Sequence, residues 1–366
     1  MNILFLRAGI YSNLNHYLLH AMKRTHSIVK NVDAGRVIKR KSLQFSSFYN
    51  IAYTLANSGI YFKQTHSKNS YAFLKMTEYC DQFVSSRNDY DIIFQTQCKF
   101  SITRNPESKP YFIYTDLTQI ITEKVWPKWA LRSNKKEVDK WYKLETEAFN
   151  RATKIFTFNN YIKNSFVEDY HIPEEKVVVV GSGVNHNGWI NVDIEKKEEN
   201  GFTLFFLTTE FERQGGPTIV KAFEKARKKA KNIKLIIGGN CPANLPRSIE
   251  THTNLSREKI EHLFDLTTVF LLPGYLGGLQ SVLEAMCKKC TCIVGDKNFL
   301  LYDIVKNNET GFVVETNNVD QLTNKIIDLF HNQKQTREIA ENAYNLVQDN
   351  FTWDKIVKKM TMYFEK

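Results

Sequence analysis

The chain has 366 residues, 42% of them hydrophobic, and a formal net charge of +11. This length suits two domains that each bury a core, and the composition is that of an ordinary globular protein. No apolar run approaches the roughly 18 to 20 residues of a membrane span, and the opening residues MNILFLRAGI lack the pattern of a signal peptide. We therefore expect a cytoplasmic protein.

Short β-rich runs alternate with helical stretches along the whole chain. The first half has predicted strands at 2–6, 91–97, 111–116, 154–158 and 176–184, with a helical stretch at 134–152. A polar, charged segment, 191–201, reads as a surface connector. The second half has predicted strands at 202–208, 233–239, 268–273, 291–296 and 311–315, with predicted helices at 217–230, 256–266, 278–289, 299–308 and 319–332.

This alternation predicts the fold class. Continuous apolar strands joined by helices are typical of parallel sheets that are covered on both faces. The sequence therefore predicts an α/β protein with two doubly wound, Rossmann-like domains that face a central cleft. Ligands of such sheets bind at the carboxyl ends of the strands, so catalytic and binding residues are expected at those positions.

The charge is distributed unevenly. Residues 1–183 hold 26 Lys and Arg against 16 Asp and Glu, whereas residues 184–366 hold 24 against 23. The basic excess indicates an anionic partner of the first half, such as a membrane surface, a phosphorylated acceptor or nucleic acid, although ordinary solvated lysines explain the same count. The chain has no recognisable nucleic-acid-binding signature, so we expect no nucleic-acid partner.

The six cysteines are too few for a disulfide framework. Three of them form the segment CKKCTC, Cys287 to Cys292, but a structural zinc ion needs four ligands and no nearby His or Cys completes the set. We therefore expect no metal site, and we expect Cys290 and Cys292 to pack as small apolar residues of a buried strand.

The stretch GGLQSVLEAM, residues 277–286, places two glycines before a helix. Its apolar spacing directs four side chains to the sheet, namely those of Leu279, Val282, Leu283 and Met286. The backbone N–H groups and the dipole at such a helix start suit a phosphate or diphosphate. Glu284 lies off the apolar stripe and could accept both hydroxyl groups of a ribose. An exposed pair with Lys288 is the alternative.

The segment FLLPGYLGGLQSVLEAMCKKCTCIVGD, 270–296, resembles the C-terminal signature of retaining GT-B glycosyltransferases of the group 1, or family 4, type. VVVVGSGVN (177–185) resembles the interdomain segment of this family, EFERQGGPTIVKAF (210–223) its phosphate-clamp loop, and FTWDKIVKKMTMYFEK (351–366) its closing helix. The resemblance is good over 110–366 and holds only in outline before that. It implies an N-terminal acceptor-side domain, 1–183, closed by the helix 351–366, and a nucleotide-sugar-binding domain, 184–350.

The resemblance also implies roles for single residues. It makes Glu284 the ribose-binding acid, Arg213 the clamp on the leaving diphosphate and Asp116 the acid beside the sugar and acceptor, and these three are the predicted catalytic residues. The predicted donor-binding residues are Gly9, Arg213, Gln214, Gly239, Thr253, Gly277, Gly278, Leu279, Gln280, Ser281 and Glu284. A surface charge is the alternative for Arg213, and a helix N-cap is the alternative for Asp116.

Three positions depart from the family pattern. Leu276 stands where the first acid of the paired-glutamate motif is expected, Gln214 where a clamp lysine is expected, and Thr115 where a histidine precedes the acid. These departures bear on contact with the donor sugar, on phosphate stabilisation and on the wall that faces the sugar.

We therefore expect a retaining, metal-independent hexosyltransferase. It would move a sugar from a UDP- or GDP-sugar, which is its co-substrate, to a glycan, a lipid-linked acceptor or a protein, and it would use no cofactor. The basic first half could place it on the cytoplasmic face of a membrane. The alternative is a non-catalytic GT-B subunit that binds nucleotide-sugar or acts as a scaffold.

Overall fold

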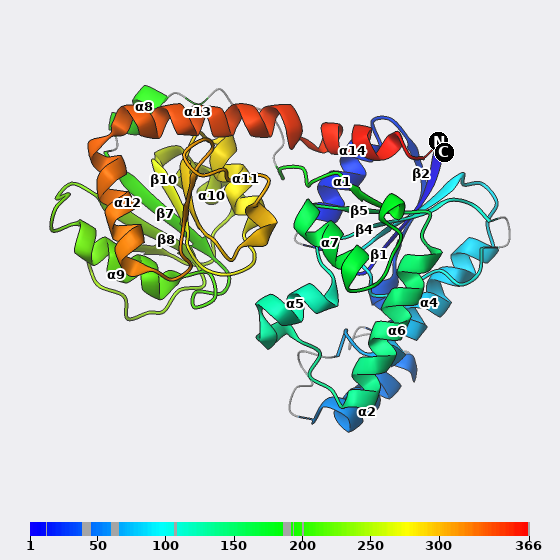
Figure 1. The fold of residues 1–366 in the computed structure, drawn as a ribbon. Helices are drawn as coiled ribbons and strands as arrows, with labels where there is room; N and C mark the ends of the chain where they lie inside the picture. The colour runs from blue at the N-terminus through cyan, green and yellow to red at the C-terminus, as the bar shows by residue number, and fades with distance from the viewer. Residues whose placement is uncertain are drawn as a thin grey trace. The chain divides into compact units, whose positions relative to one another are not determined.

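The computed structural model describes residues 1–11, 13–38, 45–59, 66–105, 108–185, 192, 194–199 and 201–364. The chain divides into two compact units, one of Met1–Gly183 with Trp353–Lys366 and one of Val184–Thr352. Each unit is built on a six-stranded sheet with helices on both faces (Figure 1). The prediction of two doubly wound α/β domains is confirmed.

The sheet of the first unit has the order β2-β1-β3-β4-β5-β6, and every pair of neighbouring strands is parallel. Its strands are β1 (Asn2–Arg7), β2 (Ser27–Asp33), β3 (Ile92–Thr96), β4 (Tyr111–Tyr114), β5 (Lys154–Thr157) and β6 (Val177–Val179). β3 and β4 are buried along their whole length, as expected for central strands that helices cover on both faces. The edge strand β2 is mostly exposed at its start, and its polar sequence gave no strand signal.

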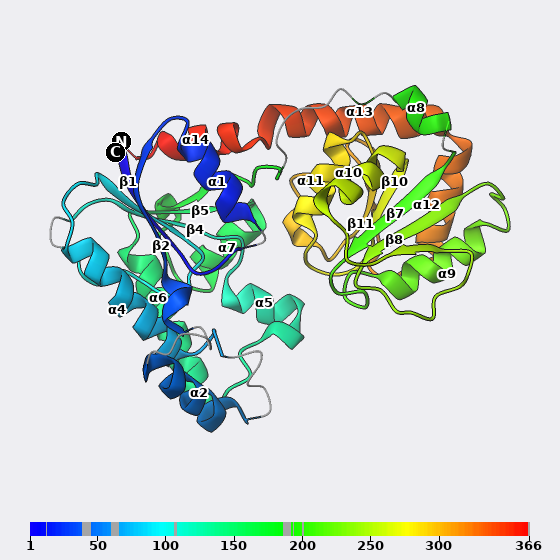
Figure 2. The ribbon, with the colours of Figure 1, turned by 180° about the vertical axis from the view of Figure 1, so that it is seen from behind.

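Helices of the first unit lie on both sides of this sheet. In Figures 1 and 2, α4 and α6 lie side by side on one side, and α1 and α14 lie side by side on the other. The helices are α1 (Leu14–Met22), α2 (Phe45–Ser58), α4 (Ser70–Ser85), α5 (Gln119–Val125), α6 (Lys135–Arg151), α7 (Asn160–Glu168) and α14 (Trp353–Thr361), with short 3-10 turns η1 (Ala34–Ile38), η3 (Pro127–Trp129) and η4 (Glu174–Lys176).

Polar side chains set where several of these helices begin. The side chains of Asn69, Asn134 and Asn159 accept hydrogen bonds from backbone N–H groups in the first turns of α4, α6 and α7. Thr118 caps α5 in the same way, by accepting from the N–H of Ile121. The alternative reading of Asp116 as the cap of this helix is therefore wrong.

The end of the chain completes the core of the first unit. Only glycine fits at position 183, because a Cβ there would overlap the ring of Trp353, the first residue of α14. The ring of Phe364, just after α14, lies 5.0 Å from that of Phe112 on β4, and both side chains are buried. This packing makes α14 part of the unit formed by the first half of the chain.

The sheet of the second unit has the order β12-β11-β10-β7-β8-β9 and is also parallel throughout. Its strands are β7 (Thr203–Thr208), β8 (Lys234–Gly239), β9 (Glu250–His252), β10 (Val269–Leu272), β11 (Thr291–Gly295) and β12 (Phe312–Val314). α9 packs beside α12, and α11 packs beside α13 (Figure 1). The helices are α8 (Ile194–Glu199), α9 (Gly216–Ala226), α10 (Arg257–Leu266), α11 (Leu279–Cys287), α12 (Val319–His331) and α13 (Gln333–Asn350), with one 3-10 turn, η5 (Phe299–Leu301).

Two predictions about local structure were wrong. The segment 191–201, predicted as a surface connector, contains α8, and the side chain of Lys197 in this helix is buried. The stretch 299–308, predicted as a helix, forms only the turn η5 before the chain turns toward β12. Leu300, Leu301 and Ile304 are buried there, so an apolar run that fills a core was mistaken for helical periodicity.

The prediction for the cysteine segment is confirmed as far as packing is concerned, because Cys290 and Cys292 are fully buried. Among the described residues, no three His, Cys, Asp or Glu side chains gather as a metal site would need. No helix in the described part of the chain is both long and apolar enough to cross a membrane.

Candidate functional site

Two loops of the second unit meet at the carboxyl edge of its sheet. One follows β7 and leads into α9, and the other follows β10 and leads into α11; β7 and β10 are neighbours. The N–H of Tyr275 in the second loop donates to the carbonyl of Arg213 in the first, at 2.9 Å. Gly274 permits this approach, because a Cβ there would collide with the backbone of Arg213 and Gln214. The two loops are therefore fixed against each other, backbone on backbone.

The Arg213 guanidinium lies directly against the glycine that precedes α11. A Cβ on Gly277 would come within 2.6 Å of Nη1 of Arg213, and Gly277 also has a φ of +117°, which favours glycine. Asn298 holds this glycine from the other side, because its Nδ2 donates to the Gly277 carbonyl at 2.8 Å and its Oδ1 accepts from the Gly277 N–H at 3.3 Å. The structure thus places a cation at the start of α11.

α11 begins at Leu279, after Gly278 in the left-handed conformation. The predicted apolar stripe is confirmed: Leu279, Val282, Leu283 and Met286 are all buried. The first N–H groups of a helix have no acceptor within the helix and carry its positive dipole end. A positive helix end and a guanidinium therefore converge at Gly277, which is an arrangement suited to a diphosphate.

Neighbouring polar groups hold Arg213 and Gln214 in this loop. Arg213 is 4% exposed, and its Nε and Nη2 donate to the two carboxylate oxygens of Glu210, each at 3.1 Å. Because the side chain is buried, the reading of Arg213 as a surface charge is wrong. Oε1 of Gln214 accepts from the Thr208 hydroxyl and from the N–H groups of Thr209 and Glu210. Gln214 therefore shapes the loop at the position where the family pattern has a cation.

Glu284 on α11 is buried and is held by an arginine on a different helix. Its Oε1 accepts from Nη1 of Arg257, the first residue of α10, at 2.8 Å. Its position off the apolar stripe predicted an exposed side chain, and this is corrected, because only 8% of the Glu284 side chain is exposed. The alternative pair with Lys288 is wrong: the Lys288 ammonium, itself buried, contacts Asp265 at 2.7 Å.

Burial and charge act on Glu284 in opposite directions. Burial raises the pKa of its carboxyl, Arg257 lowers it by charge and hydrogen bonding, and the nearby charge of Glu261 raises it. The net pKa lies above the usual value for a glutamate. Arg257 is therefore the main group that favours the ionised form of this carboxyl.

The positions predicted to meet the nucleotide base lie along β8 and β9. Gly239 ends β8 with a φ of +96°, and a Cβ there would overlap the carbonyl of Thr208 on β7. Thr253 is exposed directly after β9. Leu276, at the position of the first motif acid, is fully buried, so no polar group replaces that acid.

Gly9 and Asp116 lie in the other unit, at the carboxyl edge of its sheet. Gly9 follows β1 with a φ of +84°, and its N–H donates to Oδ1 of Asp33 at 3.0 Å. Asp116 follows β4, and its N–H donates to the Tyr11 hydroxyl at 3.0 Å. Thr115 is buried, and its hydroxyl donates to the Leu117 carbonyl.

Two lysines, Lys68 and Lys99, influence the charge of Asp116. Burial raises the pKa of the half-buried Asp116 carboxyl, and the Tyr11 hydroxyl and the charges of Lys99 and Lys68 oppose this. Burial also lowers the pKa of each lysine, and the proximity of Lys68 lowers that of Lys99 further. The edge that carries Asp116 therefore holds both signs of charge close together.

Sequence reasoning missed three residues of the second unit that hold the predicted ones. Glu210 binds Arg213, Asn298 binds Gly277 and Arg257 binds Glu284. Glu210 could have been found, because it lies three residues before Arg213 in the same loop. Asn298 and Arg257 are distant in sequence from their partners, and only the fold brings them together.

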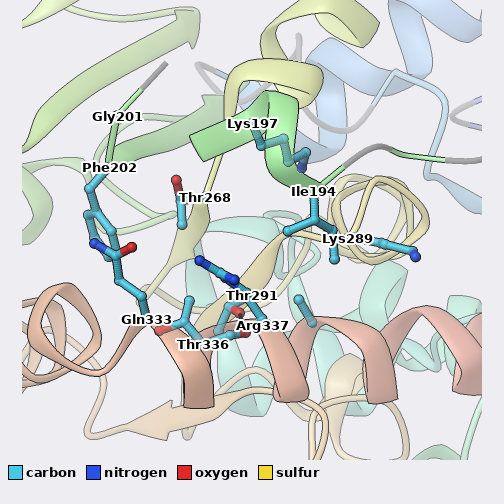
Figure 3. Close-up of a pocket in the computed structure, with 11 residues that line it drawn as sticks. Ile194, Lys197, Gly201, Phe202, Thr268, Lys289, Thr291, Gln333, Thr336 and Arg337 are labelled. Atoms are coloured by element: carbon cyan, nitrogen blue, oxygen red, sulfur yellow. Dashed lines mark hydrogen bonds between the residues drawn. The ribbon is translucent and has the colours of Figure 1, made fainter. Parts of the chain in front are cut away.

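A separate cavity lies at the opposite, amino-terminal edge of the same sheet (Figure 3). It is lined by residues at the starts of β7, β10 and β11 and by α8 and α13, and it contains none of the predicted site residues. The ammonium of Lys197 donates there to the carbonyls of Thr267 and Lys288, which end α10 and α11. Because helix C-termini are partly negative, Lys197 stabilises these two helix ends.

Solved structures of glycosyltransferases have a similar architecture. HepE of Anabaena, crystallised with UDP, aligns over 100% of both chains with a TM-score of 0.66 and 14% identity. This chain therefore has the GT-B fold. Residues 189–346 match the family model described as "Glycosyl transferases group 1".

Curated relatives are similar over part of their length. An uncharacterized glycosyltransferase of Methanocaldococcus jannaschii is 26% identical over 60% of this chain and 57% of its own. The UDP-Gal:alpha-D-GlcNAc-diphosphoundecaprenol alpha-1,3-galactosyltransferase of Escherichia coli is 24% identical over 63% of this chain and 64% of its own. This chain thus spans about three fifths of the length of these two relatives.

Proposed function

We propose that this protein is a retaining glycosyltransferase that transfers a hexose from a nucleotide-diphosphate sugar, UDP- or GDP-linked, to a glycan, lipid-linked or protein acceptor. One observation carries the proposal: the Arg213 guanidinium lies against Gly277 at the amino end of α11. The family match of residues 189–346 supports the same assignment.

The diphosphate would bind at the start of α11. Gly277, Gly278 and the N–H groups of Leu279, Gln280 and Ser281 allow close approach of the backbone to phosphate oxygens. Arg213 is held on Glu210 and can donate to the same oxygens. A fixed guanidinium stabilises the charge that develops on the diphosphate as the bond to the sugar breaks.

The nucleoside would lie further along α11. Glu284 would accept hydrogen bonds from the ribose hydroxyl groups, and the backbone near Gly239 and Thr253 would meet the base. The spacing supports this arrangement, because Glu284 lies more than one turn past the first residue of α11.

The proposed transfer needs no covalent bond between the sugar and the enzyme. The bond between the anomeric carbon and the diphosphate oxygen breaks, and the acceptor oxygen forms the new bond on the same face. The acceptor proton passes to an oxygen of the departing diphosphate. The protein supplies orientation and electrostatic stabilisation in this scheme, and Asp116 and Gly9 are proposed to contact the sugar and the acceptor.

We propose that this transfer needs no metal ion. Metal ions neutralise phosphate charge in many transferases, and here the α11 amino end and Arg213 would supply the positive charge. The experiment is to measure turnover in EDTA, which should leave it unchanged. A loss of turnover that Mg²⁺ or Mn²⁺ restores would contradict the proposal.

A non-catalytic role is the second candidate, and the burial of Leu276 favours it. The position of the first motif acid holds a fully buried apolar side chain, so this polar contact to the donor sugar is replaced by packing. A protein that binds nucleotide-sugar without transferring it would shift its melting temperature with the ligand but would release no nucleotide. The two measurements together separate the candidates.

We also propose that the first unit contacts an anionic membrane surface. Residues 1–183 carry ten more basic than acidic side chains. On α2, Phe48 and Leu55 are seven residues apart on one helix face and are 63% and 53% exposed. Vesicle binding should rise with anionic lipid and fall with salt, because screening shortens the reach of surface charge. Binding to neutral vesicles as strong as to anionic vesicles would contradict the proposed membrane contact.

The test of the donor proposal is a thermal-shift screen of UDP, GDP, ADP and their sugars. A ligand at a hundredfold excess over its dissociation constant stabilises the folded state by about 2.7 kcal/mol. UDP or GDP should raise the melting temperature, and Arg213→Ala should reduce the shift. A chain that responds to none of these nucleotides would contradict both candidate functions.

A further inference from the structure

The Arg257 side chain joins three parts of the second unit around Glu284. Its Nη1 donates to Oε1 of Glu284 at 2.8 Å, and its Nε donates to Glu261 at 2.9 Å. Its Nη2 donates to the backbone carbonyl of Asn185 at 3.1 Å. One guanidinium therefore fixes the second turn of α11, the first turns of α10 and the segment that enters the unit.

Asn185 is held on its other side as well. Its N–H donates to the side-chain oxygen of Gln280, in the first turn of α11, at 3.0 Å. Asn185 is thus fixed between Gln280 and Arg257, and Glu284 lies one turn after Gln280 on the same helix. A change at Arg257 would loosen the surroundings of Glu284 on both sides.

The contacts of Glu284 leave one carboxylate oxygen available. Oε1 accepts from Arg257, and among the described residues Arg257 is the hydrogen-bond donor to this carboxylate. The two side chains differ in exposure, with 37% for Arg257 and 8% for Glu284. Glu284 is therefore buried, whereas Arg257, which holds it, is partly exposed to solvent.

We propose that Arg257 is a positioning residue for the donor nucleotide: it anchors Oε1 of Glu284 and so presents Oε2, ionised, to the ribose hydroxyl groups. This inference rests on the proposed function for the contact between Glu284 and ribose. Arg257 lies outside the sequence motifs that predicted the site, and the hydrogen-bond acceptor at Glu284 is then a carboxylate rather than a carboxylic acid. A carboxylate accepts hydrogen bonds only and binds hydroxyl groups more strongly than its neutral form.

The ionisation of Glu284, and with it the proposed ribose contact, should depend on pH. The charged and titratable groups that face its carboxyl are Arg257 and Glu261 from α10 and Cys287 from α11. Only Arg257 favours ionisation of the carboxyl, against both burial and the charge of Glu261. Without Arg257 the pKa of the Glu284 carboxyl should rise further, so the carboxyl should keep its proton up to a higher pH.

The experiment is a double-mutant cycle on UDP binding with Arg257→Ala, Glu284→Gln and both together, measured by calorimetry. Each single substitution should weaken binding by about tenfold, the cost of one charged hydrogen bond. If Arg257 acts through Glu284, the double variant should bind as Glu284→Gln does. Losses that multiply in the double variant would overturn the proposal and would indicate direct contact between Arg257 and the nucleotide.

Arg227→Ala is the matched control, because Arg227 also pairs with a glutamate, Glu224, in the same unit but at the surface. It should leave UDP binding unchanged. Arg257→Lys keeps the charge but cannot make all three contacts, so its binding should fall between those of the wild type and Arg257→Ala. A lysine variant that binds no better than the alanine variant would contradict a role through charge.

A second arm needs no nucleotide. The carboxyl carbon of Glu284 can be titrated by NMR, and its pKa should be higher in Arg257→Ala than in the wild type or in Arg227→Ala. An unchanged titration would overturn the proposal even if UDP binds. Failure of the wild type to bind UDP while the titration shifts as expected would instead contradict the proposed function.

Discussion

Replacing Glu284 by alanine tests the proposed ribose contact with a predictable magnitude. The carboxylate would accept hydrogen bonds from ribose hydroxyl groups, and a hydrogen bond to a charged group contributes about 1.5–3 kcal/mol. A loss of that size weakens nucleotide binding by about tenfold to a hundredfold. The fold should survive, because Arg257 keeps Glu261 and the Asn185 carbonyl as partners and is 37% exposed.

The assay is calorimetric titration of UDP and 2′-deoxy-UDP into the wild type and into Glu284→Ala. The deoxynucleotide should bind the wild type less well and the variant almost equally, because both changes remove the same interaction. Melting temperatures without ligand control for damage to the fold. A deoxy penalty that is undiminished in Glu284→Ala would place the ribose contact elsewhere and refute the reasoning.

Three further predictions concern turnover, phosphate charge and stability. Arg213→Ala should lower turnover by about a hundredfold to a thousandfold and weaken nucleotide binding less, because the guanidinium acts on the departing diphosphate; equal turnover in steady-state kinetics would contradict that role. Gly277→Ala should weaken UDP binding, because its Cβ would displace the Arg213 guanidinium; calorimetry that shows wild-type affinity would count against the site. Burial raises the pKa of Glu145 from its usual 4.5 to about 7, so its contribution to stability is full below pH 4.5 and is lost as the pH rises through 7. The unfolding free energy of Glu145→Gln relative to that of the wild type should therefore rise by on the order of 3 kcal/mol between pH 4.5 and 8. Denaturant titrations that give the same difference between variant and wild type at both pH values would refute this.

The sheets could be predicted well because their central strands are apolar throughout. β4, β7, β10 and β11 are buried almost completely, so the length and the pattern of their apolar runs were sufficient to find them. The edge strands β2 and β9 were missed because they are short or polar and bury few side chains. Tertiary pairing, rather than local sequence, makes these two segments strands.

The start and the buried face of α11 could be predicted, but the contacts of its polar side chains could not. The glycine spacing before α11 and its apolar stripe indicated where the helix begins and which face is buried, and the structure agrees. The sequence could not show that Glu284 is buried against Arg257, because the partner lies 27 residues away on another helix. Nor could it show that Lys288 pairs with Asp265, since helical spacing made Glu284 the nearer candidate.

The roles of Asp116, Gly9 and the base-contacting residues stay predictions. Local geometry accounts for each position without a ligand: Gly9 by its hydrogen bond to Asp33, and Gly239 by its packing on Thr208. A residue that local structure already explains carries a weaker functional signal than one that it does not explain. Arg213 and Glu284 carry the stronger signal, because the fold buries a charged group at each position, which is costly even though Glu210 and Arg257 pair with them.

The most direct test of the central claim is ¹H NMR of the products when the protein is incubated with α-linked UDP- and GDP-sugars. Retaining chemistry at this site predicts that the nucleotide diphosphate is released and that the first sugar product to form has the α configuration. A first product with the β configuration would contradict retention, and nucleotide binding without any release would favour the non-catalytic candidate.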